Sequence, residues 1–154
     1  MKFSTKEDIE APIEAVFEML CDFEIYERAA MRRGAEVQRT DSLTKPGVGM
    51  GWRGMFNLRG KRREVEIEMI TFDRPEEIVL ECQSPGLLTM MNIELVALSK
   101  NRTRLMIAFD IKPLNLSARL LVQSLKLAKA SLTKKFKLRI AEFAKSLEER
   151  QQRG

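Results

Sequence analysis

The spacing of hydrophobic residues changes along the chain and divides it into segments of strand and of helix. Residues 2–10 alternate between apolar and polar side chains, which predicts a half-buried β-strand. From Pro12, which suits the first turn of a helix, apolar residues recur every three or four positions. This spacing predicts a short helix, followed by a second helix over residues 24–33 that stops at Gly34.

Alternation returns after Gly34 in six segments that are separated by turn residues. The predicted strands are residues 35–40, 51–58, 63–72, 77–83, 88–98 and 103–111. Strands that are buried on both faces, as in parallel sheets, show unbroken apolar runs instead. Together with the first strand, the pattern therefore predicts a seven-stranded antiparallel sheet with one face toward water.

A long helical segment is predicted after Pro113, from about residue 117 to about residue 150. At about 100° per residue, one stripe of this helix is apolar throughout. The members of the stripe are Leu121, Leu125, Ala128, Leu132, Phe136, Ile140, Phe143 and Leu147. Such a stripe is expected to pack against the sheet.

Four stretches of the sequence resemble, in order, landmarks of one known superfamily. They are IEAPIEAVFEMLCDFEIYE at 9–27, GVGMGWRG at 47–54 with Gly60 after it, FDRPEEIVLEC at 72–82 and TRLMIAF at 103–109. The chain is thereby similar to the START-related helix-grip superfamily, which includes the birch-pollen-allergen-like proteins and the polyketide cyclase/dehydrase and lipid-transport group. It departs from many members in the second helix, where Tyr26 and Glu27-Arg28-Ala29-Ala30 replace an aromatic-Pro-x-aromatic group.

The resemblance implies a single α+β domain over residues 1–154. In the helix-grip fold, a curved antiparallel sheet of seven strands wraps around a long C-terminal helix, and two short helices lie between strands 1 and 2. The resemblance also implies a cavity for a lipid, an isoprenoid or a polyketide-like molecule. Binding or transport of such a molecule without catalysis is the expected function. The alternatives are a polyketide cyclase/dehydrase-like enzyme and a membrane-docking chaperone for a quinone or a lipid.

The glycines at 49, 51 and 54 spell G-x-G-x-x-G, the pattern of a dinucleotide-binding loop. That loop requires an apolar strand before the first glycine and a helix that begins at the third. Here the preceding stretch DSLTKP is polar, and only ten residues separate Gly54 from Val65, too few for a crossover helix. The glycines therefore favour a loop and a bent strand, in which Gly54 leaves a gap between Trp52 and Phe56.

The predicted ligand site comprises the inner face of the sheet and the facing stripe of the helix. Alternation and helical spacing place on these faces Trp52, Phe56, Leu58, Val65, Ile67, Met69, Leu80, Met91, Ile93, Ile107, Leu125, Leu132 and Phe136. The alternative at each position is a side chain that only fills the core. Lys129 falls inside the apolar stripe, where it could pair with a carboxylate or phosphate of the ligand. The alternative is that its ammonium group extends outward to water.

The composition gives little support to catalysis or to metal binding. The chain has no histidine, and its two cysteines, Cys21 and Cys82, lack the spacing of metal ligands. It also shows no nucleophile with a nearby base and no paired carboxylates on an apolar face. We therefore expect no metal and no cofactor, and no catalytic residue is predicted. A cyclase could still act by shaping its substrate with few polar groups, so enzymatic activity is left open.

The net charge of +5 is unevenly distributed along the chain. Residues 100–140 contain eleven lysines or arginines and one acidic residue. The basic helix face away from the apolar stripe carries Leu120, Leu127, Lys134, Lys137 and Leu138. Leucines bordered by lysines predict docking on an anionic membrane surface, whereas a solvated basic face or a dimer seam is the alternative. A nucleic-acid partner is not favoured, because one Trp and one Tyr provide no aromatic pair within the basic segment.

Two further features bear on location. No run of eighteen apolar residues occurs that could span a bilayer as a helix. The first ten residues, MKFSTKEDIE, are charged and therefore differ from a secretory signal peptide. A cytoplasmic protein is the resulting expectation.

Overall fold

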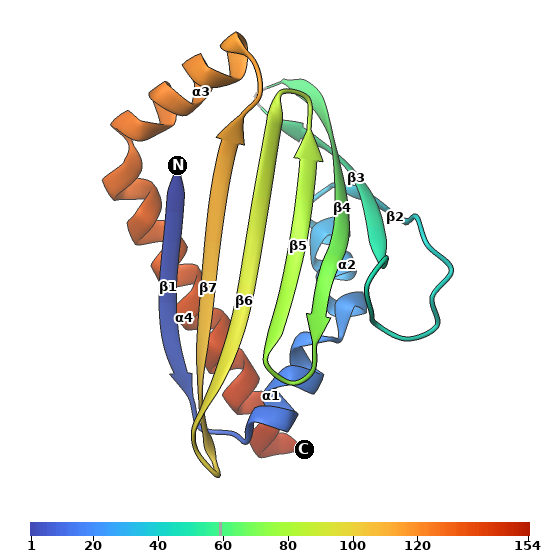
Figure 1. Ribbon diagram of the computed structural model, residues 1–154, viewed down its shortest axis with the longest axis vertical. Helices are drawn as coiled ribbons and strands as arrows, with labels where there is room; N and C mark the ends of the chain where they lie inside the picture. Colours follow the sequence, from blue (N-terminus) through green and yellow to red (C-terminus); the bar gives the residue numbers. More distant parts are fainter. Residues whose placement is uncertain (59) are drawn as a thin grey trace.

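Seven antiparallel strands form one sheet in the order β1-β7-β6-β5-β4-β3-β2 (Figure 1). The computed structural model describes residues 1–58 and 60–154. The strands are β1 (Lys2–Ile9), β2 (Glu36–Arg39), β3 (Gly51–Leu58), β4 (Lys61–Asp73), β5 (Glu77–Ser84), β6 (Leu87–Ser99) and β7 (Arg102–Pro113). The helices are α1 (Ile13–Leu20), α2 (Phe23–Arg32), α3 (Leu116–Leu127) and α4 (Lys129–Arg153). The predicted curved seven-stranded sheet, the two short helices between β1 and β2 and the C-terminal helical segment are thereby confirmed.

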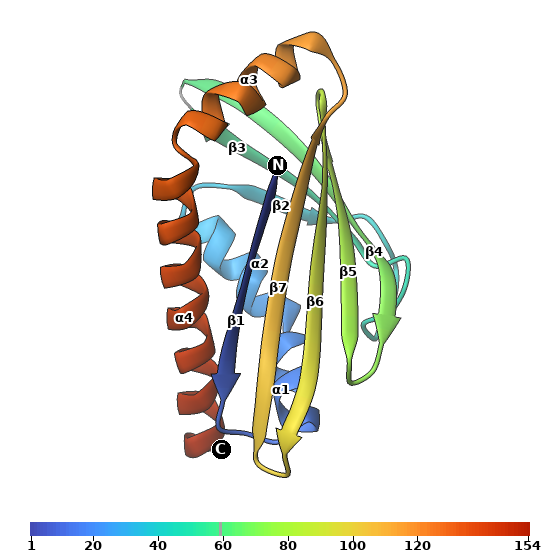
Figure 2. The same cartoon turned by 60° about the vertical axis from the view of Figure 1, so that its left-hand side comes forward.

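The helices α1, α2 and α4 cover one face of the sheet, and the other face is open to water (Figures 1 and 2). The most deeply buried side chains lie toward the α1 end of the molecule. They are Ile9, Val16, Phe17, Met69, Ile78, Leu105 and Leu147. The ring of Phe17 packs edge-on against Phe72 at 5.4 Å between centroids. The solid core is therefore concentrated at one end of the sheet, beside α1.

The predicted single helix over residues 117–150 is wrong, because the segment is broken at Ala128. Ala128 has φ −104° and ψ 14°, outside the helical region, and α3 and α4 meet there at an angle (Figure 2). A straight helix of this length would extend about 50 Å, whereas the twelve residues of β7 span about 40 Å. The bend lets α3 bury Ala118 and Val122 instead of overrunning the sheet.

The glycines of the G-x-G-x-x-G pattern serve a tight loop and the start of β3, as the sequence predicted. Gly49 has φ +95°, which only glycine adopts at little cost. At Gly51 a Cβ atom would collide with the hydroxyl of Thr40 and would lie 3.2 Å from the carbonyl oxygen of Ile67. No helix begins at Gly54, which lies within β3, so the geometry of a dinucleotide-binding loop is absent from this described segment.

An ion pair at the end of β2 fixes the entry into β3. Arg39 Nε donates to Asp41 at 2.8 Å, and the same carboxylate accepts the backbone N–H groups of Gly51 at 2.8 Å and Leu43 at 2.9 Å. The hydrogen bond from Arg39 is the main reason why the pKa of Asp41 lies well below its ordinary value. Asp41 is therefore a carboxylate at neutral pH and holds the loop against the edge of the sheet.

Candidate functional site

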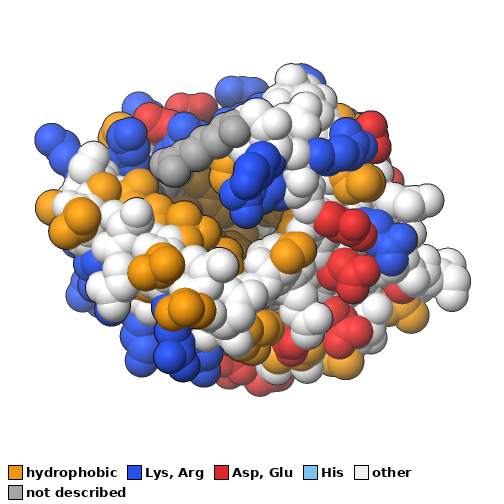
Figure 3. Space-filling view, turned by 90° about the horizontal axis from the view of Figure 1, so that it is seen from above, with side chains coloured by type: hydrophobic (Ala, Val, Ile, Leu, Met, Phe, Trp, Pro, Cys, Tyr) orange, Lys and Arg blue, Asp and Glu red, His pale blue; other side chains and the backbone are white. Residues whose placement is uncertain are grey.

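A cavity of about 470 Å³ lies between the sheet and the helices α2 and α4. Its walls are almost entirely apolar. They are formed by Leu20, Phe23, Tyr26, Glu27, Ala30, Ala35, Val37, Trp52, Gly54, Phe56, Val65, Ile67, Ile78, Leu80, Met91, Ile93, Ile107, Ile140 and Phe143. Seen from the α3 end, the molecule is hollowed and hydrophobic side chains form the floor of the hollow (Figure 3). The sheet thus encloses space at the end that the core leaves unfilled.

The sheet side of this cavity coincides with the site expected from alternation. Eight of the predicted ligand residues line it: Trp52, Phe56, Val65, Ile67, Leu80, Met91, Ile93 and Ile107. They come from five neighbouring strands, β3 to β7, and point to the same face because side chains alternate along each strand. Gly54 lies between Trp52 and Phe56 on this face and also lines the cavity, where it contributes no side chain.

Five other predicted residues lie outside the cavity lining. Met69 is fully buried in the core, and Leu58 is exposed at the end of β3. Phe136 packs between Phe109 and Phe3, with centroid distances of 5.5 and 6.2 Å. Leu125 and Leu132 are half-buried on the two sides of the helix break.

Lys129 also lies away from the cavity. It is the first residue of α4 and is exposed to solvent. The prediction assumed one continuous helix, and the break at Ala128 removes the angular relation between Lys129 and the apolar residues of α3. The structure does not bring this ammonium group to the ligand space.

The α2 side of the cavity was not predicted from the sequence. Phe23, Tyr26, Glu27 and Ala30 line this wall from α2, and Val37 joins them from β2. The signal was present in the spacing of Phe23, Tyr26 and Ala30, which recur at helical intervals. Ile140 and Phe143 of α4 also line the cavity, and both belong to the predicted apolar stripe.

Two titratable side chains occur among the lining residues, and both form hydrogen bonds with protein groups. Trp52 Nε1 donates to Glu27 Oε2 at 3.1 Å, and the guanidinium of Arg39 lies 5.7 Å from the Trp52 ring centroid. The hydroxyl of Tyr26 donates to the carbonyl of Leu20 at 2.9 Å. Burial raises the pKa of Tyr26 well above its ordinary value, so the phenol is neutral. These bonds orient the α2 wall and leave the rest of the lining apolar.

The two cysteines do not provide a reactive thiolate. Burial raises the pKa of Cys21 and of Cys82 to about 11, so both are protonated thiols at neutral pH. Within residues 1–58 and 60–154, no group of three His, Cys, Asp or Glu side chains is arranged to hold a metal ion.

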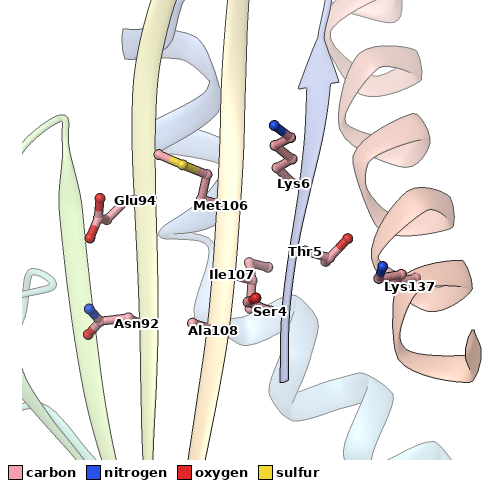
Figure 4. Close-up of a pocket in the computed structure, with 9 residues that line it drawn as sticks. All are labelled: Ser4, Thr5, Lys6, Asn92, Glu94, Met106, Ile107, Ala108 and Lys137. Atoms are coloured by element: carbon pink, nitrogen blue, oxygen red, sulfur yellow. The ribbon is translucent and has the colours of Figure 1, made fainter. Parts of the chain in front are cut away.

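A second hollow, of about 530 Å³, lies over β1, β6 and β7 (Figure 4). Ser4, Lys6, Asn92 and Glu94 line it and alternate with inward-facing residues, so they belong to the outer face of the sheet. Lys137 approaches from α4. Exposed charges of both signs surround this space, and water competes for each of them. It is therefore a weaker candidate for a hydrophobic ligand than the cavity on the inner face.

Comparison with protein-family models and with curated proteins finds no match to this chain. Solved structures do match it. The aromatase/cyclase Zhui from Streptomyces sp. R1128 has a TM-score of 0.63 at 15% identity, over 97% of this chain and 94% of that one. Norcoclaurine synthase from Thalictrum flavum has a TM-score of 0.65 at 11% identity, over 97% and 84%.

A START superfamily protein from Mycobacterium smegmatis matches with a TM-score of 0.55 at 14% identity, over 87% of this chain and 95% of that one. At these identities the likeness establishes the fold alone. The matches extend over 87% to 97% of the chain. The chain therefore shares the helix-grip fold with these proteins.

Proposed function

We propose that the protein binds a hydrophobic small molecule, a lipid, an isoprenoid or a polyketide-like compound, in the cavity between sheet and helices, and carries it without catalysis. The apolar cavity of about 470 Å³ carries this proposal. Small-molecule sites typically have volumes of about 300 to 1,000 Å³ and mostly apolar walls. The fold, which is shared with an aromatase/cyclase and with a START protein, supports a ligand-binding role.

The hydrophobic effect is sufficient to drive such binding. Each methylene group transferred from water to an apolar site contributes about 0.8 kcal/mol. A ligand with about ten buried methylenes would gain about 8 kcal/mol before the costs of association. We therefore expect micromolar or weaker affinity for simple hydrocarbon chains, and tighter binding for a ligand whose shape and polar groups match the cavity.

The alternative is a cyclase-like enzyme. Glu27 is the single carboxylate among the lining residues, and its Oε2 atom is held by Trp52 Nε1 at 3.1 Å. A reaction in this cavity would therefore use Glu27 as its proton acceptor. Turnover of a polyketide-like substrate by the wild type, and its loss in Glu27→Gln, would favour this alternative over a carrier.

Titration with the neutral dye N-phenylnaphthylamine tests the binding proposal. The fluorescence of this dye rises when it enters an apolar site, so the expected result is a saturable increase with one dye per chain. Decanol, which occupies the same kind of space, is expected to displace it. A signal that does not saturate, or that decanol leaves unchanged, would contradict a defined cavity site.

A basic, leucine-bearing face of α3 supports docking of this carrier on an anionic membrane. The structure exposes all five surface residues predicted from the sequence: Leu120, Leu127, Lys134, Lys137 and Leu138. On α3, Leu116, Leu120 and Leu127 fall within about 40° on the helical wheel. Because the helix breaks at Ala128, this row belongs to α3 and does not continue along α4.

The position of α3 suits such docking. Leu120 and Leu127 are 65% and 92% exposed, and Arg119 and Lys126 lie beside their row. Exposed hydrophobic side chains also lie around the hollow that opens at this end (Figure 3). No described helix is long and apolar enough to cross a bilayer. We propose that α3 lies on the membrane surface, so that a ligand passes from lipid into the cavity without crossing water.

Vesicle co-sedimentation tests the role of α3. Leu120→Asn with Leu127→Asn is expected to lower binding to phosphatidylserine-containing vesicles about tenfold, because two leucines no longer enter the interface. The matched control is Val96→Asn with Leu98→Asn, which changes two exposed residues, 44% and 42% accessible, at the opposite end of β6. Equal binding of the two double variants would contradict docking through α3.

A further inference from the structure

Arg63 is a basic side chain on the apolar inner face of the sheet. Along β4, Arg63, Val65 and Ile67 are half-buried, and they alternate with exposed residues on the outer face. Val65 and Ile67 line the cavity, so alternation places Arg63 on the cavity side. Arg63 is also paired with Phe56 of β3, another lining residue. The aliphatic part of the Arg63 side chain therefore continues the wall that these side chains form.

The register of the sheet puts Arg63 at the open end of this wall. Glu66 pairs with Gln83, and β5 ends one residue later at Ser84. Arg63 consequently lies beyond the last residue of β5, where β4 is flanked by β3 alone. In both views the end of β3 and the start of β4 lie at the same end of the molecule as α3, the end where it is hollowed (Figures 1, 2 and 3). Arg63 thus continues the row of Val65 and Ile67 toward this end, next to the residues that line the cavity but not among them.

The polar side of Arg63 lacks a protein partner among the described residues. Its Nε atom is buried and forms no hydrogen bond with an acceptor in residues 1–58 and 60–154. A buried donor without a partner costs about 1 to 3 kcal/mol. No carboxylate of the described residues forms an ion pair with this guanidinium either. One buried donor of this guanidinium, Nε, therefore has no partner among the described protein groups.

Neighbouring arginines on the outer face differ in this respect. Arg62 donates to Glu36 at 2.8 Å, and Arg53 forms ion pairs with Glu64 at 3.1 Å and Glu66 at 3.0 Å. Each of these guanidinium groups already forms an ion pair with a carboxylate. Arg62, one residue away on the same strand, is consequently a matched control for charge and position.

We propose that Arg63 binds the acidic head group of the ligand, so that the cavity takes an amphipathic acid, a hydrophobic chain or ring system with a carboxylate or phosphate at one end. This inference rests on the proposed ligand-binding function. A guanidinium offers paired N–H donors that match the two oxygens of such a group. The apolar part of the ligand then fills the cavity toward Leu80 and Ile107, while its acidic end stays beside Arg63. Arg63 thus takes the role that was predicted for Lys129.

Two related dyes separate the head group from the apolar part. Anilinonaphthalene sulfonate is N-phenylnaphthylamine with an added sulfonate, an oxyanion that stands in for a carboxylate or phosphate. Arg63→Met is expected to weaken binding of the sulfonate dye about tenfold, which corresponds to about 1.4 kcal/mol. Binding of the neutral dye is expected to change less than twofold. Arg63→Lys is expected to retain most of the preference, and Arg62→Met is expected to bind both dyes as the wild type does.

Thermal unfolding of the free protein distinguishes ligand binding from a structural role of Arg63. If Arg63 only stabilised the fold, its replacement would lower the unfolding midpoint. Because Arg63 lacks a partner, Arg63→Met is expected to leave the unfolding midpoint unchanged or to raise it. A lowered midpoint, unchanged sulfonate binding, or equal weakening of both dyes would overturn the assignment. If neither dye binds the wild type, the proposed function itself fails. Should Arg63→Met not fold, Arg63→Gln replaces it with the same expected results.

Discussion

Gly54→Phe is expected to lower the affinity for N-phenylnaphthylamine at least thirtyfold, a loss of about 2 kcal/mol, while the protein stays folded. Gly54 lies on the cavity wall between Trp52 and Phe56. Its Cβ atom would lie 3.2 Å from Val65 Cγ1, so a small shift of that methyl group admits the new side chain. The added ring then occupies the space that we assign to the ligand. Replacement of an in-strand glycine also removes the weakness that glycine gives to a strand.

Fluorescence titration measures the affinity of Gly54→Phe for the dye, and circular dichroism shows whether this variant is folded. The control is Gly47→Phe, in the loop before β3, where a Cβ atom would meet no other atom within 4 Å. This variant is expected to bind the dye as the wild type does. If Gly54→Phe folds and binds with unchanged affinity, the dye site lies outside the cavity.

Leu147→Ala is expected to lower the free energy of unfolding by about 3 kcal/mol. Leu147 is 0% exposed and anchors the C-terminal half of α4 in the core beside α1. Its truncation removes buried methyl groups and leaves a void. Because α4 also supplies Ile140 and Phe143 to the cavity wall, a looser helix is expected to weaken dye binding as well.

Urea unfolding measures this effect, and Leu138→Ala is the control on the same helix. Leu138 is 60% exposed, so its truncation is expected to change the free energy of unfolding by less than about 0.5 kcal/mol. Similar losses for the two variants would mean that burial along α4 differs from the structure described here. A larger loss for Leu147→Ala supports the anchoring of α4 at its C-terminal half.

The strands could be predicted closely because each has one buried and one solvated face. Alternation placed β3 at residues 51–58, the range that the structure shows. The break between α3 and α4 could not be predicted, because the residues around Ala128 include neither glycine nor proline. The bend follows from the length of the helix relative to the sheet, a tertiary effect that helical periodicity does not contain.

The candidate site likewise contains residues that periodicity identifies and residues that only the tertiary structure identifies. Residues on the sheet side, such as Trp52 and Ile67, could be identified from alternation alone. The spacing of Phe23, Tyr26 and Ala30 contained a signal for the α2 wall, but only the structure shows that this wall faces the cavity and that Glu27 accepts a hydrogen bond from Trp52. Arg63 shares the alternation of Val65, so its face could have been identified, but its missing partner is visible only in three dimensions.

Mass spectrometry of an organic-solvent extract of the purified wild-type protein tests whether the cavity holds a ligand. We expect close to one hydrophobic molecule per chain, with an acidic group, in the wild type. We also expect that Gly54→Phe, purified in the same way, lacks this molecule. An extract of the wild type that contains no more organic compound than that of Gly54→Phe, from a protein that also fails to bind N-phenylnaphthylamine, would contradict ligand binding in the cavity.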